Sequence, residues 1–223
     1  MIALQEIWKE YPINKEEVFT ALKGVSLSIA PGEFVAITGP SGCGKSTTMQ
    51  ILGLLDRPTR GKVLIGDKEA EKLSDDELSR LRNEYIGFVF QQFNLINKLT
   101  VLENVLVPTV YARKKLGYNP RDHAVYLLER FGLKEKIRSY PNKISGGQQQ
   151  RVAIARSLIM NPDFVLADEP TGNLDTQTGE EIMKLFTQLN KEDNITIVLV
   201  THEHDIAMRA RRQIQMKDGK IIS

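Results

Sequence analysis

Apolar residues gather in four short segments of the chain, each bounded by turn residues. These segments are Phe34–Thr38, Ile86–Phe90, Phe164–Ala167 and Ile195–Val200. Nearly continuous apolarity over four to six residues is typical of strands buried on both faces. Helical patterns lie between them, at Lys45–Leu55, Asp75–Glu84, Gln148–Met160 and Thr178–Lys191. Strands that alternate with helices predict an α/β fold with a mainly parallel sheet covered on both faces.

Other parts of the chain have a different pattern. ALKGVSLSIAPGE, GKVLIGDKE and IQMKDGKIIS alternate apolar and polar residues around turn glycines, which predicts a smaller antiparallel sheet against the main one. Residues 94–141 contain no strand-like run and several helical ones, including PRDHAVYLLERFGL. We therefore expect one domain over residues 1–223, with a core of about 1–93 and 160–223 and an inserted helical subdomain of about 94–159.

Composition narrows the class of protein. A net charge of +2, with 26% charged residues, predicts neither a polyphosphate-coating protein nor a polybasic membrane binder. The single cysteine, Cys43, excludes an internal disulfide and fits a reducing compartment. No apolar run approaches the roughly twenty residues of a membrane span, and the first residues lack the pattern of a signal peptide. We expect a cytoplasmic protein that reaches any membrane through a partner.

A phosphate-binding loop is the clearest motif. GPSGCGKST, from Gly39 to Thr47, matches G-x-x-x-x-G-K-[ST] and lies between a predicted strand and a predicted helix, as the motif requires. Glycines let backbone N–H groups converge on phosphates, and the N-terminus of the following helix attracts anions. We expect Lys45 to contact the β- and γ-phosphates of ATP or GTP, and Ser46 to ligate Mg²⁺. Cys43 lies within this loop, where we interpret it as a small side chain that the loop tolerates. We also expect a thiol-modifying reagent to inactivate the protein and bound nucleotide to protect it.

Polar side chains follow three of the predicted strands. Asp168 and Glu169 follow FVLA, where the first carboxylate can hold the Mg²⁺ shell and the second can orient a water as general base. His202 follows TIVLVT and can hydrogen-bond a γ-phosphate. Gln91 follows IGFVF and is a candidate for a Mg²⁺ or water contact. Ligands bind at the carboxyl ends of parallel strands, which favours a common site for these residues.

Two features bear on the base of the nucleotide. The residues Asn190–Asp193 have the N-K-x-D spacing that recognises guanine in many GTPases. They end a predicted helix rather than a strand, so we interpret them as a solvated helix terminus. Tyr11, predicted to be an exposed aromatic in the loop KEYPINKEE, could stack on a purine or simply pack, and stacking would favour ATP over GTP only weakly.

The segment ISGGQQQRVAIAR opens a predicted helix with two glycines. The Ser145 hydroxyl and the backbone N–H groups of Gly146 and Gly147 suit the far side of a γ-phosphate. The helical lobe should hold this segment away from the phosphate loop of its own chain. Two copies arranged head to tail, each lending SGGQ to the nucleotide of the other, would form two composite sites.

In their order and spacing, these motifs resemble the nucleotide-binding subunit of an ABC transporter over the whole chain. The matching features are Tyr11, the phosphate loop, Gln91, ISGGQ, LADE, GNLD with Asp175, and His202. Ile144 stands where the family more often has Leu. FVFQQFNLINKLTVLENV and ADEPTGNLD resemble the lipoprotein-release and macrolide-export branch, in which the ATPase serves a membrane subunit that typically carries an extracytoplasmic domain.

The resemblance implies roles for particular residues. The nucleotide contacts would be Tyr11, Gly39, Ser41, Gly42, Cys43, Gly44, Lys45, Ser46, Thr47, Ser145, Gly146, Gly147, Gln148 and Asp175. The catalytic residues would be Glu169, His202, Lys45 and Gln91, and the Mg²⁺ ligands would be Ser46, Gln91 and Asp168. It also implies ATP as substrate, a homodimer, and a permease partner at the cytoplasmic face of the membrane. A cytoplasmic helix of that permease would enter a groove lined by Gln91 and residues 93–99, with residues 139–142 nearby.

Two other classes of protein compete with this interpretation. A soluble ABC ATPase acting on nucleic acid or ribosomes commonly has long insertions or two ATPase halves, and this chain has neither, nor a basic stripe. A monomeric P-loop kinase or GTPase would not explain ISGGQQQR or His202. No nucleic-acid partner is therefore expected.

Overall fold

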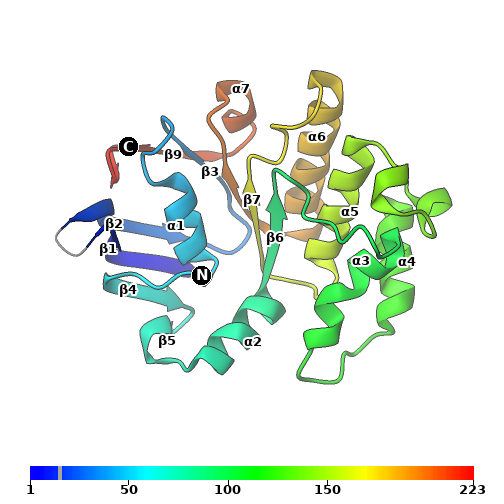
Figure 1. The fold of residues 1–223 in the computed structure, drawn as a ribbon, viewed down its shortest axis with the longest axis horizontal. Helices are drawn as coiled ribbons and strands as arrows, with labels where there is room; N and C mark the ends of the chain where they lie inside the picture. Colours follow the sequence, from blue (N-terminus) through cyan, green and yellow to red (C-terminus); the bar gives the residue numbers. More distant parts are fainter. Residues whose placement is uncertain (15–16) are drawn as a thin grey trace. The chain divides into compact units, whose positions relative to one another are not determined.

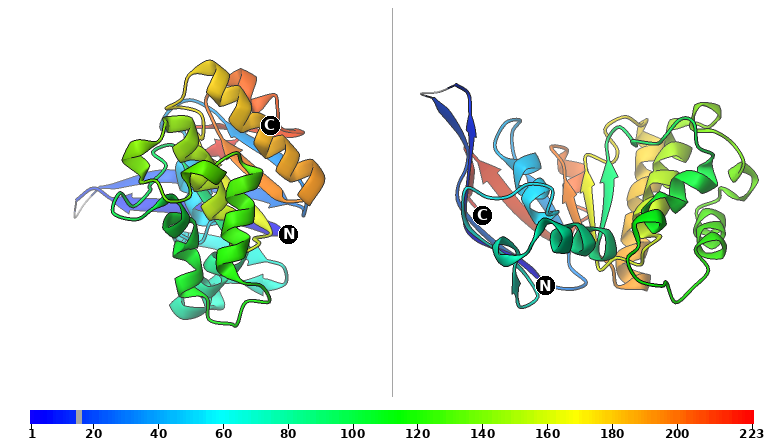
Figure 2. Two further views of the ribbon diagram at one scale, coloured as in Figure 1. Left: turned by 90° about the vertical axis from the view of Figure 1, so that its right-hand side faces the viewer. Right: turned by 60° about the horizontal axis from the view of Figure 1, so that its bottom comes forward.

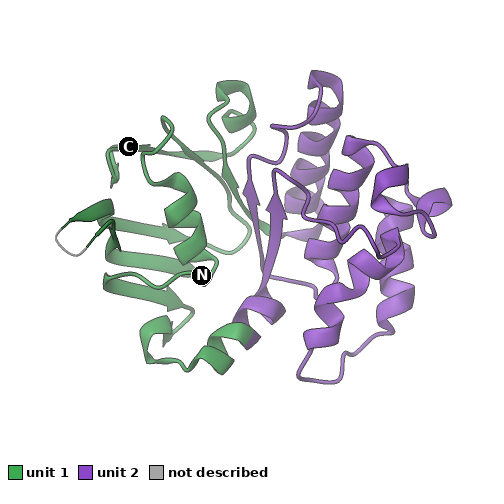
Figure 3. Ribbon diagram, in the orientation of Figure 1, with its two compact units in different colours: residues 1–79, 196–223 green, residues 80–195 purple. Residues whose placement is uncertain are grey.

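Residues 1–14 and 17–223 are described by a computed structural model, and they fall into two units of contacting residues (Figure 3). Unit 1 comprises Met1–Ser79 and Thr196–Ser223, and unit 2 comprises Arg80–Ile195. Each unit contains both strands and helices (Figure 1), so the α/β prediction is confirmed. Helix α2 (Asp75–Tyr85) crosses from one unit into the other.

Unit 1 contains an antiparallel sheet in the order β2-β1-β4-β5. Its strands are β1 (Ile2–Pro12), β2 (Val18–Ile29), β4 (Arg60–Ile65) and β5 (Lys68–Glu69), and the 3₁₀ helix η1 (Ala70–Lys72) follows them. The predicted antiparallel sheet is thus confirmed for two of the three expected segments. Strand β1 completes it, although the charged residues along that strand hide it from a search for apolar runs.

A second set of strands in unit 1 carries the phosphate loop. Its members are β3 (Phe34–Thr38), β8 (Thr196–Val200), β9 (Arg212–Lys217) and β10 (Lys220–Ile221). Strand β3 pairs in parallel with β8 on one side and with β9 on the other, and β10 is antiparallel to β9. The placement of IQMKDGKIIS in the antiparallel sheet was therefore wrong for β9. Alternation reports that one face is buried, and it does not distinguish parallel from antiparallel pairing.

Helix α1 (Lys45–Leu52) follows β3 and packs against β1, β2 and β8, and the short helix α7 (His204–Ala207) follows β8. The apolar side of α1 contributes Met49, Ile51 and Leu52 to the core of unit 1. The helix ends at Leu52, with Gly53 as its C-cap, three residues before the predicted end at Leu55. The strand β3 and the helix α1, which flank the phosphate loop, thus share the hydrophobic core of unit 1.

Unit 2 contains two parallel strands and most of the helices. The strands are β6 (Ile86–Phe90) and β7 (Phe164–Asp168), and the helices are α3 (Val101–Leu106), α4 (Pro120–Arg130), α5 (Gly146–Leu158) and α6 (Thr176–Asp193), with 3₁₀ turns η2 (Val107–Tyr111), η3 (Lys134–Lys136) and η4 (Pro141–Lys143). Helix α5 contacts β6, α3, α4 and α6, and lies beside these helices in every view (Figures 1 and 2). It is therefore the central helix of the unit.

The absence of strands from residues 94–141 is confirmed. Helices α5 and α6 begin two residues earlier than predicted. In both cases a polar side chain caps the helix, Ser145 for α5 and Asp175 for α6, and apolar periodicity carries no information about such caps.

Candidate functional site

Three glycines of the phosphate loop have a left-handed backbone that only glycine adopts without strain. Their φ values are +145° at Gly39, +76° at Gly42 and +105° at Gly44. A Cβ atom at Gly39 would lie 2.2 Å from the Met216 carbonyl oxygen, and one at Gly44 would lie 2.7 Å from the Leu22 side chain. A Cβ at Gly42 would meet nothing within 4 Å. The loop is thus closely packed at Gly39 and Gly44 and open at Gly42, as a phosphate-binding loop requires.

Lys45 begins α1 and is only 7% exposed. Its Nζ donates to the carbonyl oxygens of Gly39 and Pro40, at 2.8 and 2.9 Å. The first turn of α1 contains no acidic residue, so its N-terminus stays favourable to anions. Ser46 and Ser41 are exposed beside it. The loop therefore combines a fixed cation, open N–H groups and an accessible hydroxyl.

Cys43 is buried within the loop, at 3% exposed. A Cβ on Gly39 would approach its Sγ to 2.7 Å, so the thiol fills the space beneath that glycine. The structure therefore supports the interpretation of Cys43 as a small packing side chain, and a reagent reaches it only when the loop opens.

Tyr11 lies in strand β1 and is partly buried, so its predicted position in an exposed loop was wrong. Residues 15 and 16 of that predicted loop fall outside the described residues. The Tyr11 hydroxyl donates to Asp56 at 2.9 Å, and the Nζ of Lys9 lies 4.9 Å from the ring centre. Burial, reinforced by the hydrogen bond to Asp56, raises the pKa of Tyr11.

Asp56 anchors this arrangement. It accepts hydrogen bonds from the Tyr11 hydroxyl and, at 2.6 Å, from the Nζ of Lys9. Partial burial pushes the pKa of Asp56 upward, but the hydrogen bonds from Lys9 and Tyr11 outweigh it and hold the pKa below its usual value. Sequence analysis missed Asp56, because no motif marks it and its partners lie about 45 residues away.

Strand β8 brings His202 to the edge of unit 1 that carries the phosphate loop. Ile37 pairs with Val200, and the Thr201 N–H donates to the Ile37 carbonyl at 3.2 Å. His202 is exposed and lies two residues beyond the end of β8, at this edge. Unit 1 therefore unites Tyr11, the phosphate loop and His202.

Unit 2 unites Gln91 with the loop that follows β7. Phe90 pairs with Asp168, so Gln91 and Glu169 leave their strands at the same edge. The Asn173 side chain donates to the Gln91 carbonyl at 2.9 Å, and a Cβ on Gly172 would lie 2.7 Å from the Gln91 amide. Gln91 is therefore seated against the GNLD segment.

Glu169 has a strained backbone. Its φ is +43°, although the next residue is proline, which disfavours a helical backbone before it. Such outliers cost about 1–3 kcal/mol and cluster at functional sites. Asp168 ends β7 and is half-buried, as is Glu169. Two carboxylates, one on the strand and one on a strained turn, thus lie at this edge.

The SGGQ segment forms the N-terminus of α5, as predicted. Exposed Ser145 caps the helix by accepting from the Gln148 N–H at 3.3 Å, and the Gln148 side chain accepts from the Ser145 N–H at 3.1 Å. A Cβ on Gly147 would lie 2.3 Å from the methyl carbon of Thr178. Asp175 caps α6, and the hydrogen bonds from Thr178 lower its pKa.

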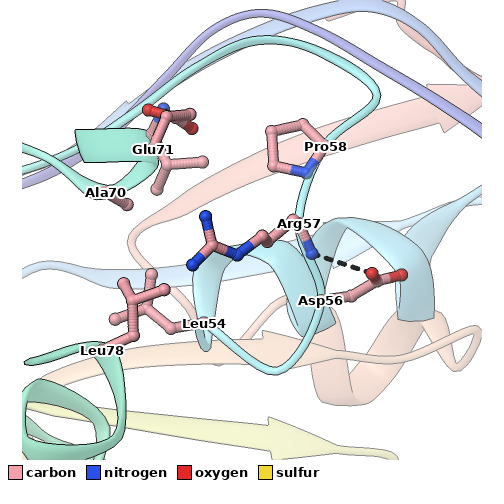
Figure 4. A pocket seen from close by; sticks show the side chains of 8 residues that line it. Leu54, Asp56, Arg57, Pro58, Ala70, Glu71 and Leu78 are labelled. Carbon is pink, nitrogen blue, oxygen red and sulfur yellow. Dashed lines mark hydrogen bonds between the residues drawn. The ribbon is translucent and has the colours of Figure 1, made fainter. Parts of the chain in front are cut away.

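Asn190–Asp193 form the end of α6, where Asp193 pairs with Arg130 at 2.8 Å. Their interpretation as a helix terminus is confirmed, and residues 191–193 are solvated as expected, but Asn190 is buried at 4% exposed, so the solvated assignment was wrong for it. A pocket elsewhere in unit 1 is shown in Figure 4; it is lined by Leu54, Asp56, Arg57, Pro58, Val63, Ala70, Glu71 and Leu78. The phosphate loop does not contribute to it, so this pocket is not the nucleotide site.

The strand, glycine loop and helix of unit 1 define a P-loop nucleotide-binding protein. Residues 22–172 match the family described as ABC transporter, and the chain belongs to that family. It is 50% identical to an uncharacterized ABC transporter ATP-binding protein of Methanocaldococcus jannaschii, MJ0796, over 99% of this chain and 95% of that protein. A solved structure of MJ0796, described as a dimeric, post-hydrolysis state bound to ADP and Pi, has a TM-score of 0.91 at 47% identity and covers 100% of this chain and 97% of that one.

Longer proteins are also similar. The chain is 48% identical to the macrolide export ATP-binding/permease protein MacB of Syntrophobacter fumaroxidans, over 99% of this chain but only 31% of that protein. These relatives support a transporter ATPase rather than an ABC ATPase acting on nucleic acid. The chain is an ABC ATPase that binds and hydrolyses ATP with Mg²⁺. Among the residues that the structure describes, no helix is long and apolar enough to cross a membrane.

Proposed function

We propose that two copies of this chain pair head to tail and bind ATP between the phosphate loop of one copy and the Ser145–Gly147 turn of the other. The observation that carries this proposal is that each unit offers half of a nucleotide site. Unit 1 presents an open glycine cradle with a fixed lysine, and unit 2 presents an exposed, capped helix N-terminus. The similar MJ0796 structure, a dimer with ADP and Pi, supports the same arrangement.

Within one copy, Lys45 and the loop N–H groups hold the phosphates, and Tyr11 lies beside the base. Ser46, Asp168 and Gln91 offer hydroxyl, carboxylate and amide oxygens, the ligand chemistry that Mg²⁺ prefers. Bound Mg²⁺ neutralises charge on the phosphates. Ser46 is exposed in the first turn of α1, so its hydroxyl is accessible to the metal.

Glu169 acts as the general base. It orients a water and accepts its proton as the water oxygen attacks the γ-phosphorus. The bond from the γ-phosphorus to the β,γ-bridging oxygen breaks, ADP leaves with that oxygen, and inorganic phosphate is released. His202 hydrogen-bonds the phosphoryl group. The strained Glu169 turn supports this role, because strain persists where the surrounding structure fixes a functional conformation. A positioned base of this kind is typically worth about 10²–10⁴ in rate.

The work is delivered to a membrane permease. MacB relatives are named as ATP-binding/permease proteins, and this chain spans about a third of them but nearly all of MJ0796. On the resemblance to the lipoprotein-release and macrolide-export branch, the permease is proposed as a separate subunit with an extracytoplasmic domain. Residues 94–159 form the lobe that receives its cytoplasmic helix, beside Gln91. The chain is then peripheral on the cytoplasmic face of the membrane.

The first test is ATPase rate against protein concentration. The composite site predicts a quadratic dependence at low concentration, and a linear dependence would contradict it. Glu169→Gln should bind ATP, hydrolyse it very slowly and elute as a dimer with ATP, measured by light scattering. A monomeric, fully active Glu169→Gln variant would refute the mechanism.

The second test places a bulky cation at the α5 turn. Ser145→Arg should abolish hydrolysis and leave nucleotide binding by the same chain intact. Ser74→Arg is the matched control, because Ser74 caps α2 through the same reciprocal arrangement, with Glu77. If both variants lost hydrolysis equally, the loss of a helix cap would explain the result, and the proposed contact of Ser145 with the nucleotide would be contradicted.

A further inference from the structure

The turn after β7 is held from outside its own segment. Glu169 and Pro170 follow the strand directly, and the Gly172 N–H donates to the Glu169 carbonyl at 3.1 Å. A proline has no N–H, so this turn has one backbone donor fewer to fix it. The strained φ of +43° at Glu169 therefore needs support from neighbouring elements.

Helix α5 supplies such support through Gln150. This side chain is 0% exposed, and its Nε2 donates to the Pro170 carbonyl at 2.7 Å. Gln150 lies on the buried face of α5, together with Ala153, Ile154 and Ser157. It is five residues from Ser145, so one helix connects the SGGQ turn to the residue that follows Glu169.

The buried amide of Gln150 costs free energy of folding. Its Oε1 is buried and has no hydrogen-bond partner among the described residues. An unsatisfied buried acceptor costs free energy that an apolar side chain of the same shape would not. Stability alone would therefore favour methionine or leucine at position 150. The bond to Pro170 is what the glutamine adds.

We propose that Gln150 is a positioning residue that fixes the Glu169 turn from α5. Its hydrogen bond holds the Pro170 carbonyl, and thereby sets the direction in which the Glu169 carboxylate leaves β7. Because Ser145 caps the N-terminus of α5, a change at the SGGQ turn reaches the general base of the same chain through this bond. The inference rests on the proposed role of Glu169 as general base.

The test is a double-mutant cycle with Gln150→Met and Glu169→Gln. Methionine keeps the length and approximate volume of glutamine and removes the donor. Gln150→Met should lower kcat about tenfold, which is part of the roughly 10²–10⁴ that a placed base supplies, and leave the KM for ATP unchanged. In the Glu169→Gln background the same change should have no further effect on single-turnover hydrolysis, because the base it positions is already gone.

Asn190→Leu is the matched control. Asn190 is 4% exposed in α6, and its amide donates to the Ile195 carbonyl at 2.9 Å, far along the helix from Asp175. Asn190→Leu should lower the stability of the protein without the fall in kcat that is expected of Gln150→Met. Equal fold-losses from Gln150→Met in both backgrounds, or no loss of kcat, would overturn the proposal. So would a Gln150→Met chain that fails to fold while Asn190→Leu folds, because the glutamine would then be a stability element.

Failure of the proposed function gives a different result. If Glu169 is not the base, Glu169→Gln alone keeps the wild-type rate, whatever happens at position 150. If the head-to-tail pairing is wrong, the concentration dependence is linear, and the cycle still reports on Gln150, because both residues belong to one chain.

Discussion

Gly147→Ala should destabilise the protein through one close contact. The new Cβ would lie 2.3 Å from the methyl carbon of Thr178, and real Cβ atoms essentially never approach below 3.0 Å. Thr178 cannot easily swing away, because its hydroxyl donates to Asp175 at 2.7 Å. Alanine would otherwise favour the helix, by up to about 1 kcal/mol. The overlap should win, because overpacking typically costs about 1–3 kcal/mol.

The assay is thermal unfolding followed by circular dichroism. Gly147→Ala should lower Tm by about 2–12 °C, from that cost and the usual Tm shift for a chain of this size. Thr178→Ser keeps the hydroxyl that donates to Asp175, the cap of α6, and removes the methyl group, so it should restore most of the loss in the double variant. Gly117→Ala is the control, because a Cβ there meets nothing within 4 Å. A wild-type Tm for Gly147→Ala, or no rescue by serine, would refute the reasoning.

Three further predictions concern other positions. Gly87→Ala should destabilise the protein, because the new Cβ would lie 2.3 Å from the backbone oxygen of Ser157, and no second side-chain substitution can remove that backbone contact. Urea unfolding measures the loss, and an unchanged midpoint would contradict the prediction. Asp56→Asn should lower Tm at neutral pH. Because the pKa of Asp56 is lowered in the folded protein, its carboxylate stabilises the fold at pH values above the ordinary pKa of 3.8, and this stabilisation is lost as pH falls through the lower folded pKa. The Tm difference between Asp56→Asn and wild type should therefore shrink over that pH range. A difference that stays constant would refute the assignment. Cys43, at 3% exposed, should react with a thiol reagent far faster in urea than in the folded protein, and ATP should slow the folded reaction further; equal labelling rates with and without ATP would refute the placement at the phosphates.

The local elements were largely predictable from sequence. Apolar runs located β3 and β6 at their observed bounds, because strands buried on both faces must be apolar throughout. The phosphate loop was predictable for a similar reason, since Gly39 and Gly44 have no substitute at their φ values and contacts. Strand β1 was missed and Tyr11 was misplaced in a loop, because a strand with a solvated face carries charges such as Lys9 and Glu10.

The sequence by itself predicted which residues would carry the chemistry, because phosphate, metal and base chemistry each demand particular side chains in a fixed order. Only the tertiary structure revealed what holds them. Asp56 meets Tyr11, Gln150 meets Pro170, and Gly147 faces Thr178 across 45, 20 and 31 positions, pairings that arise when helices and strands pack. The strain at Glu169 likewise belongs to the packed turn, because a free chain would relax φ to its ordinary negative range.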